Sequence, residues 1–342
     1  MFWITGGTDV FLALFALLDR RVAHFLLIQF NHSPWNGFTF YDLIFPLFVF
    51  LAGLSIPFSI TKRLERGDDK RLLYRHVAIR TCLLFALGVW HNGAAADPFT
   101  LRLPGVLQRV AICSGVAAVI AMNARVRTQA YVAGGILLGY WALLALVPVP
   151  LFGAGDLSPQ GNFAGYVDRL LLPFPNRWCC YGFGDSEGII TTIPAVATAL
   201  LGTMAGHRLR AAGTAAFRGW WFVVTGVAGV AAGLAWSLVF PINKNLWTSS
   251  YVLLTGGLSL LLLALFHWII DVRRMTGWTF FFTVIGTNSL VMYLLQGILR
   301  FEFLKRLYGT SAALALLVAC LELSSRWGIV YWLYRRRWFV RF

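Results

Sequence analysis

Long apolar runs separated by short polar breaks recur along this chain and constrain its fold more than any other feature. Crossing a bilayer takes about 20 consecutive, mostly apolar residues in a helix. The pattern predicts ten spans, at residues 1–18, 40–60, 72–90, 104–122, 129–148, 189–206, 219–240, 247–270, 278–299 and 311–334. We therefore expect an all-α, multi-pass transmembrane bundle of about ten spans, with residues 1–342 forming a single transmembrane domain.

The composition argues against a separate soluble domain. Soluble domains are about half apolar and about a quarter charged, whereas 58% of these residues are hydrophobic and 13% are charged, with a mean hydropathy of +0.70. The net charge of +15 lies in short loops rather than on a basic face of a soluble module, so nucleic acid is not an expected partner. The sequence has no CxxC or HExxH spacing, and we expect no metal.

Lys and Arg are unevenly distributed between the two sets of loops. The more basic set comprises 61–71, 123–128, 207–218, 271–277 and the tail after residue 334. It carries 16 Lys and Arg, whereas the opposite set carries 9 although it is longer. Because cytoplasmic loops hold the excess of these residues, we expect a cytoplasmic C-terminus in the cell inner (cytoplasmic) membrane. The loop at 300–310, with three cations, is the exception.

A polar and aromatic stretch, NHSPWNGFTFYDLIFP at 31–46, runs directly into the second predicted span. Ionisable groups that enter a bilayer are costly, so Asp42 is a functional candidate by default. His32 lies ten residues earlier. An imidazole can take a proton near neutral pH, and a carboxylate can orient it and stabilise its charged form. Alternatively, His32 is a loop residue and Asp42 a helix-entry cap.

The stretch RLPGVLQR at 102–109 places Arg102 at the outer edge of a span and Gln108 with Arg109 inside it. Burying a guanidinium at this depth is costly unless an anion or a water-filled cavity receives it. A phosphate or thioester ligand would do so. The alternative is a salt bridge to a carboxylate of a neighbouring span.

Shorter polar groups add weaker signals. PINKNLW at 241–247 offers Asn243, Lys244 and Asn245 in a short turn, which can bind a polar ligand. Alternatively, Asn245 is the N-cap of the next helix. Asn288 lies inside an apolar span, and Glu187 precedes one.

Together these stretches resemble the heparan-alpha-glucosaminide N-acetyltransferase family. The resemblance runs in order along nearly the whole chain and rests on NHSPWNGFTFYDLIFP, RLPGVLQR, GYVDRLLLP, SEGIITTIPA with LGTMAG, PINKNLWTSSY and GTNSLVMY. The family includes the lysosomal enzyme and many bacterial relatives. It implies a membrane-embedded acyltransferase that takes acetyl-CoA from the cytosolic side and acetylates a glucosamine-type amine on the outer side.

The resemblance also implies site residues. The His of the HxxWNG stretch is the family's active-site residue and falls on His32, and Asp42 matches the acidic residue that follows. Motif positions that carry over as cavity residues are Arg102, Asn243, Lys244, Asn245 and Asn288. The predicted set that binds acetyl-CoA or the acceptor also includes Asn36, Gln108, Arg109 and Glu187.

The beginning of the chain departs from the family pattern. Relatives usually start with a basic and acidic stretch of the form LDALRGFDMFW, whereas this chain starts at the final MFW. The first predicted span also lacks an inner anchor and has few apolar residues. We therefore expect the native protein to extend upstream of Met1. The large luminal domain of the lysosomal enzyme has no counterpart here, so a heparan substrate does not carry over.

The expected chemistry has two routes. His32 acts as a general base toward the acceptor, or it carries the group as an acetyl-His intermediate. An amide or Arg donor stabilises the oxyanion. Expected partners are acetyl-CoA, an amino sugar or glycan acceptor and the bilayer, and a homodimer stays open. Alternative functions are O-acetylation of a surface glycan and a secondary transporter or flippase, although the inverted repeat that would support transport is not found.

Overall fold

The computed structural model describes the chain except for residues 19, 95–101, 173–180, 212–213, 300–310 and 341–342. The chain divides into two compact units. Unit 1 comprises residues 1–32, 39–44 and 274–342, and unit 2 comprises 33–38 and 45–273. The exceptional loop at 300–310 lies outside the described residues. The single domain expected over 1–342 stays a prediction.

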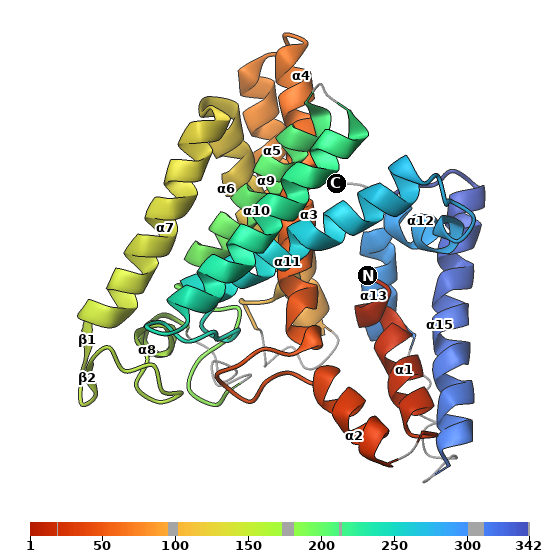
Figure 1. Cartoon of the computed structure of the whole chain (residues 1–342), viewed down its shortest axis with the longest axis horizontal. Coiled ribbons are helices and arrows are strands. Elements are labelled where there is room, and N and C mark those ends of the chain that lie inside the picture. Colours follow the sequence, from red (N-terminus) through yellow and green to blue (C-terminus); the bar gives the residue numbers. More distant parts are fainter. Residues whose placement is uncertain (19, 95–101, 173–180, 212–213, 300–310, 341–342) are drawn as a thin grey trace. The chain divides into compact units, whose positions relative to one another are not determined.

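Helices dominate both units (Figure 1). Those of unit 2 are α3 (Ile44–Ile56, from Phe45 onward), η3 (Pro57–Thr61), α4 (Lys62–Glu65), α5 (Lys70–Ala94), α6 (Val106–Asn123), α7 (Val126–Leu146), α8 (Phe163–Leu171), α9 (Thr192–Arg210), α10 (Ala215–Trp236), α11 (Ser249–His267) and η5 (Trp268–Val272). A hairpin of β1 (Pro148–Val149) and β2 (Gly153–Ala154) follows α7. Unit 1 contains η1 (Trp3–Gly7), α1 (Thr8–Phe15), α2 (Arg20–Gln29), η2 (Phe40–Leu43), α12 (Thr279–Thr287), α13 (Ser289–Ile298) and α15 (Ala312–Arg335).

Among the described residues, seven helices are long and apolar enough to cross a membrane. They are Phe40–Glu65, Lys70–Asn92, Val106–Asn123, Val126–Leu146, Phe217–Trp236, Ser249–Val272 and Ala312–Arg335. The pair α12 and α13, bent by 81°, makes an eighth if it counts as one span. An all-α membrane protein with several spans is thus confirmed, but the count of about ten is not. The predicted spans at 1–18 and 189–206 correspond to a short helix, Trp3–Phe15, and to α9.

Helix α9 fails as an apolar span because it faces protein rather than lipid. It is rich in Ala, Thr and Gly, and most of its residues are buried. Small residues allow close helix approach in membranes. A Cβ added at Gly202 would lie 1.9 Å from the Phe50 carbonyl oxygen, and one at Gly53 would lie 1.9 Å from that of Ala199. Helices α3 and α9 therefore pack backbone against backbone.

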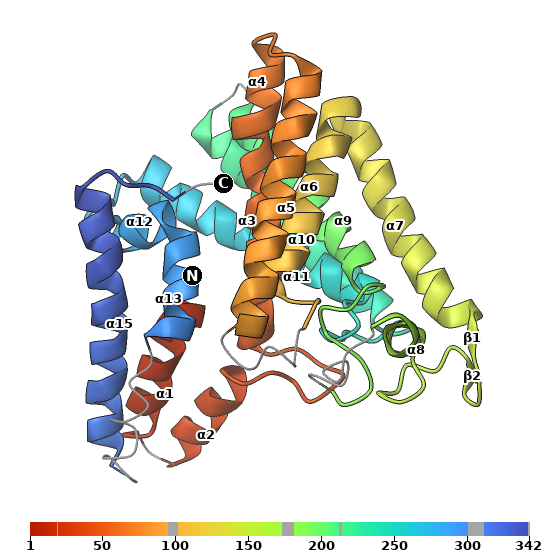
Figure 2. The same ribbon diagram turned by 180° about the vertical axis from the view of Figure 1, so that it is seen from behind.

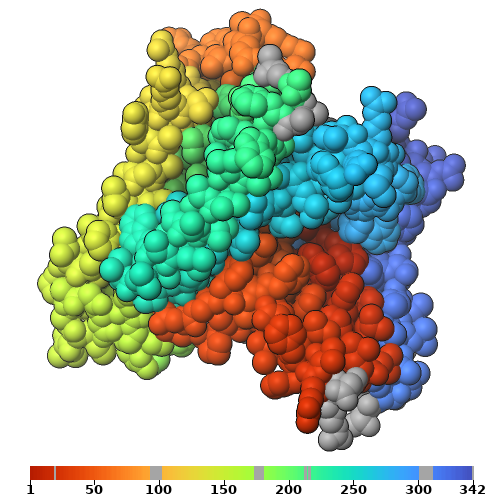
Figure 3. Space-filling model, viewed as in Figure 1, coloured from red at the N-terminus to blue at the C-terminus, as the bar shows by residue number. Residues whose placement is uncertain are grey.

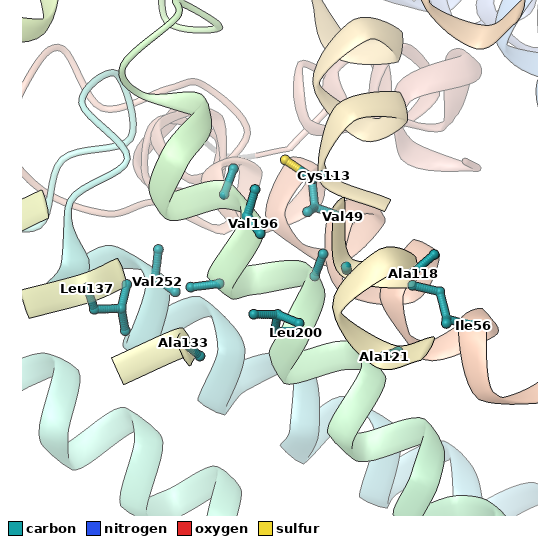
Figure 4. Close-up of a cluster of buried hydrophobic side chains, with 14 of the residues drawn as sticks. Val49, Ile56, Cys113, Ala118, Ala121, Ala133, Leu137, Val196, Leu200 and Val252 are labelled. Carbon is teal, nitrogen blue, oxygen red and sulfur yellow. The ribbon is translucent and has the colours of Figure 1, made fainter. Parts of the chain in front are cut away.

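The main core of unit 2 surrounds α9 (Figure 4). Val196 and Leu200 of α9 lie among side chains of several neighbours, including Cys113 of α6, Leu137 of α7 and Val252 of α11. All are buried, so these side chains form an apolar centre of unit 2. This core holds the polar end of unit 2 in place.

Helices α10 and α11 pack along their length (Figures 1 and 2). Their glycines make the contact, since a Cβ added at Gly257 would lie 2.5 Å from the Val230 nitrogen. The opposite side of α10 lies at the surface (Figure 3) and exposes Phe217, Trp220 and Val224. Large exposed apolar side chains are suited to contact with lipid hydrocarbon.

Unit 1 is held together by a buried charged residue in α15. Arg326, 2% exposed, pairs with Glu322 at 3.1 Å. Its guanidinium also donates to the carbonyl of Thr5 at 2.9 Å and to that of Leu299 at 2.7 Å. Both carbonyls lie where the helix is interrupted, because Gly6 has φ +125° and α13 ends at Ile298. Arg326 thus satisfies backbone groups that lipid could not.

Candidate functional site

His32 and Asp42 form a hydrogen-bonded pair in unit 1. His32 Nδ1 lies 2.7 Å from Asp42 Oδ1. The carboxylate is fully buried, whereas the His32 side chain is 49% exposed and its ring centroid lies 4.7 Å from that of Tyr41. A buried carboxylate on one ring nitrogen fixes the orientation and tautomer of an imidazole that is itself half exposed. The pair thus has the geometry of a base and its orienting acid, and its catalytic role stays a prediction.

The local chain explains why Asp42 is buried. Asp42 lies in the short helix η2, which begins after the extended residue Thr39. The Thr39 backbone N–H donates to Asp42 Oδ2 at 3.2 Å. One carboxylate oxygen therefore caps the helix entry while the other holds His32. The reading of Asp42 as a helix-entry cap is therefore confirmed, and its reading as a functional residue stays a prediction.

Arg102 joins two carboxylates in unit 2. Its Nε and Nη2 lie 2.7 and 2.6 Å from the two oxygens of Asp185, and Nη2 also donates to Glu187 Oε2. Asp185 is fully buried and Glu187 is 10% exposed. A guanidinium fork matches a carboxylate in this two-bond geometry. The structure thus brings together Arg102 and Glu187, and the sequence argument did not single out Asp185 as their shared partner.

Asp168 of α8 holds the loop that carries these carboxylates. Its oxygens accept the backbone N–H groups of Asp185 and Ile189, each at 3.1 Å. Gly188 packs directly on it, because a Cβ there would lie 2.1 Å from Asp168 Oδ2. Burial raises the pKa of Asp168 to about 6, against the lowering effect of these two backbone hydrogen bonds. The motif GYVDRLLLP contained this residue, but an acidic side chain on a short helix gave no sign of its partners.

The asparagines of PINKNLW connect three segments of unit 2. Asn243 is buried and donates from Nδ2 to Asn36 Oδ1 at 3.1 Å, while its own Oδ1 accepts the Leu246 N–H. Asn245 Oδ1 accepts the Ser186 hydroxyl at 2.7 Å. The predicted alternative of Asn245 as N-cap is wrong, because the N-cap of α11 is Thr248.

Arg109 is buried in α6 without a carboxylate partner in the described part of the chain. Its Nη2 donates to Thr191 Oγ1 at 2.5 Å, and the guanidinium carbon lies 4.7 Å from the centroid of the Trp247 ring. Nε and Nη1 have no hydrogen-bond partner among the described residues. The same holds for both amide atoms of Gln108, which is 2% exposed. Buried polar groups without partners are rare and point to a ligand or water.

Two further predicted residues remain, one in each unit. Asn288 is buried at the bend between α12 and α13 in unit 1, where its Oδ1 accepts the Val340 N–H at 3.0 Å. Its Nδ2 has no hydrogen-bond partner within the described ranges. Lys244 of unit 2 is half-buried, in the turn between Asn243 and Asn245. No group of three or more His, Cys, Asp or Glu suited to a metal occurs in the residues that the structure describes.

Together, the apolar spans, the His32–Asp42 pair and the buried polar groups around Arg109 define a multi-pass membrane protein with polar sites. The chain is 30% identical over 368 aligned positions to the heparan-alpha-glucosaminide N-acetyltransferases of human and mouse. The alignments cover 91% of this chain and 55% and 56% of those proteins. No protein-family model matches the chain.

The chain is therefore a family-level relative of heparan-alpha-glucosaminide N-acetyltransferase, as its motifs predicted. It spans about half the length of the curated relatives it matches.

Proposed function

We propose that this chain is a membrane-embedded acyltransferase that moves an acetyl group from cytosolic acetyl-CoA to an amino sugar on the outer side of the membrane. The observation that carries the proposal is the contact between His32 Nδ1 and Asp42 Oδ1 at 2.7 Å. The name of the two relatives supports the N-acetyltransferase class. The protein lies in the cytoplasmic membrane with its C-terminus inside, because the more basic loops belong on that side.

In this mechanism His32 handles the proton of the acceptor. With Nδ1–H donated to Asp42, Nε2 takes a proton from the amine as its nitrogen forms a bond to the acetyl carbonyl carbon. The tetrahedral intermediate collapses, the carbon–sulfur bond breaks, and the imidazolium returns the proton to the leaving thiolate. The stepwise route through acetyl-His stays open as an alternative.

Arg109 and Gln108 supply donors in this proposal. The Nε–H and Nη1–H of Arg109 and the amide of Gln108 are oriented and already out of water. Such preorganised donors suit a carbonyl oxygen that gains negative charge, or an anionic group of the donor molecule. Arg102 and Asn243 instead hold the loops in place through their hydrogen bonds to Asp185 and Asn36. Asn36 is exposed, and in this proposal it contributes to acceptor binding.

A transfer assay tests the proposal. Detergent-purified protein is incubated with labelled acetyl-CoA and a panel of amino sugars, with matched sugars that offer only hydroxyls. We expect transfer to an amine and a loss of about 10²–10⁴-fold in His32→Ala if His32 is the base. Asp42→Asn should lose less, because the base itself remains.

The matched control is His24→Ala, which removes an exposed His of helix α2. It should transfer like the unmodified protein. Folded His32→Ala that retains more than about a tenth of the activity would exclude both base and carrier roles. Transfer only to sugars that offer hydroxyls would contradict the proposed amine acceptor. Activity of a C-terminal reporter that works only outside the membrane would contradict the proposed cytoplasmic C-terminus.

A further inference from the structure

A cavity of about 460 Å³ lies in unit 2 between α9, α10, α11 and the start of α7. Its volume falls within the roughly 300–1,000 Å³ of small-molecule sites. Apart from His207, Arg208 and Thr225, its lining is apolar or Gly and comprises Val126, Leu201, Met204, Ala211, Trp221, Gly229, Leu253, Gly256, Gly257 and Leu260. A sugar or nucleotide would leave its polar groups unpaired against such a wall, so the wall fits hydrocarbon.

Glycines on two facing helices shape the apolar part. Gly229 of α10 and Gly256 with Gly257 of α11 all line the space. Helices α9, α10 and α11 lie side by side here (Figures 1 and 2). Because these glycines have no side chains, the backbones of α10 and α11 meet directly there, and a Cβ added at Gly257 would lie 2.5 Å from the Val230 nitrogen. The acyl chain of a lipid has the apolar surface that matches this lining.

Two basic residues stand at the end of the cavity where α9 ends. The Arg208 guanidinium lies over the ring of Phe217, 4.6 Å from its centroid, and its Nε has no hydrogen-bond partner among the described residues. His207 Nε2 is likewise buried without a partner in the described part of the chain. Arg210, two residues on, is by contrast satisfied by Glu65 at 2.6 Å and by the Pro57 carbonyl at 2.6 Å. The Arg208 Nε–H and the His207 Nε2 are therefore left to interact with a group outside the protein.

The charge and the lining select one kind of occupant. A guanidinium binds phosphate well, and basic pockets between spanning helices bind anionic lipid headgroups. His207 and Arg208 lie in the last turn of α9, and the sequence predicts that the more basic loops, which begin here, face the cytoplasm. We propose that the cavity holds one acyl chain of an anionic phospholipid, with its phosphate at Arg208 and His207.

Native mass spectrometry of the delipidated full chain tests this site. The protein in detergent is titrated with dioleoyl phosphatidylglycerol and with dioleoyl phosphatidylcholine. We expect one phosphatidylglycerol to bind more tightly than phosphatidylcholine. Arg208→Gln should weaken phosphatidylglycerol by about fivefold, the effect of one surface cation on an anionic lipid, and leave phosphatidylcholine unchanged. Met204→Trp, which places a larger side chain in the cavity, should weaken the binding of both lipids.

The matched control is Arg127→Gln, an exposed cation next to the lining residue Val126 in sequence. It should bind both lipids like the unmodified protein. Equal binding of the two lipids, or equal effects of the Arg208 and Arg127 variants, would overturn the proposal. So would displacement by glycerol phosphate alone, or tighter binding of palmitoyl-CoA at the same site. If Met204→Trp fails to fold, the comparison of Arg208→Gln with Arg127→Gln tests the site by itself.

Discussion

Each unit of the molecule buries an arginine in a membrane-spanning helix, and the two are treated in opposite ways. In unit 1, Arg326 uses Nε, Nη1 and Nη2 on the carbonyls of Thr5 and Leu299 and on Glu322. In unit 2, Arg109 donates from Nη2 to Thr191, while Nε and Nη1 lack partners among the described residues. Both side chains are 2% exposed or less.

The difference separates structure from function. A buried charge whose donors are all used contributes to the fold, and removing it leaves other groups unpaired. A buried charged group that has N–H donors without hydrogen-bond partners carries a desolvation cost, and the contacts within the folded chain do not offset it. Sites that bind or react with ligands are where such a cost is expected. From this contrast we expect Arg326 to contribute to stability and Arg109 to contribute to ligand binding or catalysis.

The largest effect is expected at Arg326. Arg326→Leu removes the cation that pairs with the buried Glu322 and also the donors to two carbonyls, so we expect about 3–5 kcal/mol of lost stability. Thermal unfolding in detergent and the yield of monodisperse protein measure this loss. Arg326→Lys should lose less, because it keeps the charge. A folded Arg326→Leu protein with an unchanged melting temperature would break the comparison.

Arg109→Met should act on the reaction instead. Removing one preorganised donor costs about 10²–10³-fold in rate, whereas Met replaces a charge that the protein leaves partly unpaired. We expect transfer to fall by that factor with a melting temperature close to that of the unmodified protein. Acetyl-CoA at a hundredfold excess over Kd should add about 2.7 kcal/mol to the free energy of unfolding of the unmodified protein and so raise its melting temperature. The rise should be smaller for Arg109→Met. A large drop in melting temperature with normal transfer would contradict this.

The smallest effect concerns Asp168, a buried carboxylate that forms no salt bridge with the described residues. Asp168 bonds only to backbone N–H groups in the described contacts, and burial raises its pKa to about 6. A raised pKa means that the folded state holds the proton longer, so stability is highest below the ordinary value of 3.8 and is lost as pH rises through about 6. The full loss is at most about 3 kcal/mol, at roughly 1.4 kcal/mol per pH unit.

Asp168→Asn removes this titration. Its melting temperature relative to the unmodified protein should therefore rise between pH 4.5 and pH 7.5. Thermal unfolding of both proteins at the two pH values measures the difference. A constant difference would mean that Asp168 is ionised throughout, as its two backbone donors favour.

Eight of the ten predicted spans correspond to apolar helices or to the bent pair. Hydropathy identified them because lipid-facing helices must be apolar around most of their surface. It misassigned the environment of α9, which is buried among other helices and consists of small residues. The first predicted span corresponds to the short helix Trp3–Phe15, whose backbone is non-helical at Thr5 and Gly6. The motifs found the His32 segment, the Arg102 segment and the asparagines, and the roles of these residues stay predictions.

The sequence by itself determined the membrane class, most of the spans and the family, because apolar length and unusual motifs are local properties of a chain. Only the tertiary structure decided which polar residues have partners. Arg102 reaches Asp185 across 83 residues and Asn36 reaches Asn243 across 207, and nothing local marks either pair. Arg326 and Arg109 look alike as single cations in apolar runs. Whether a buried donor is satisfied depends on atoms brought near it by packing, and that is a property of the fold.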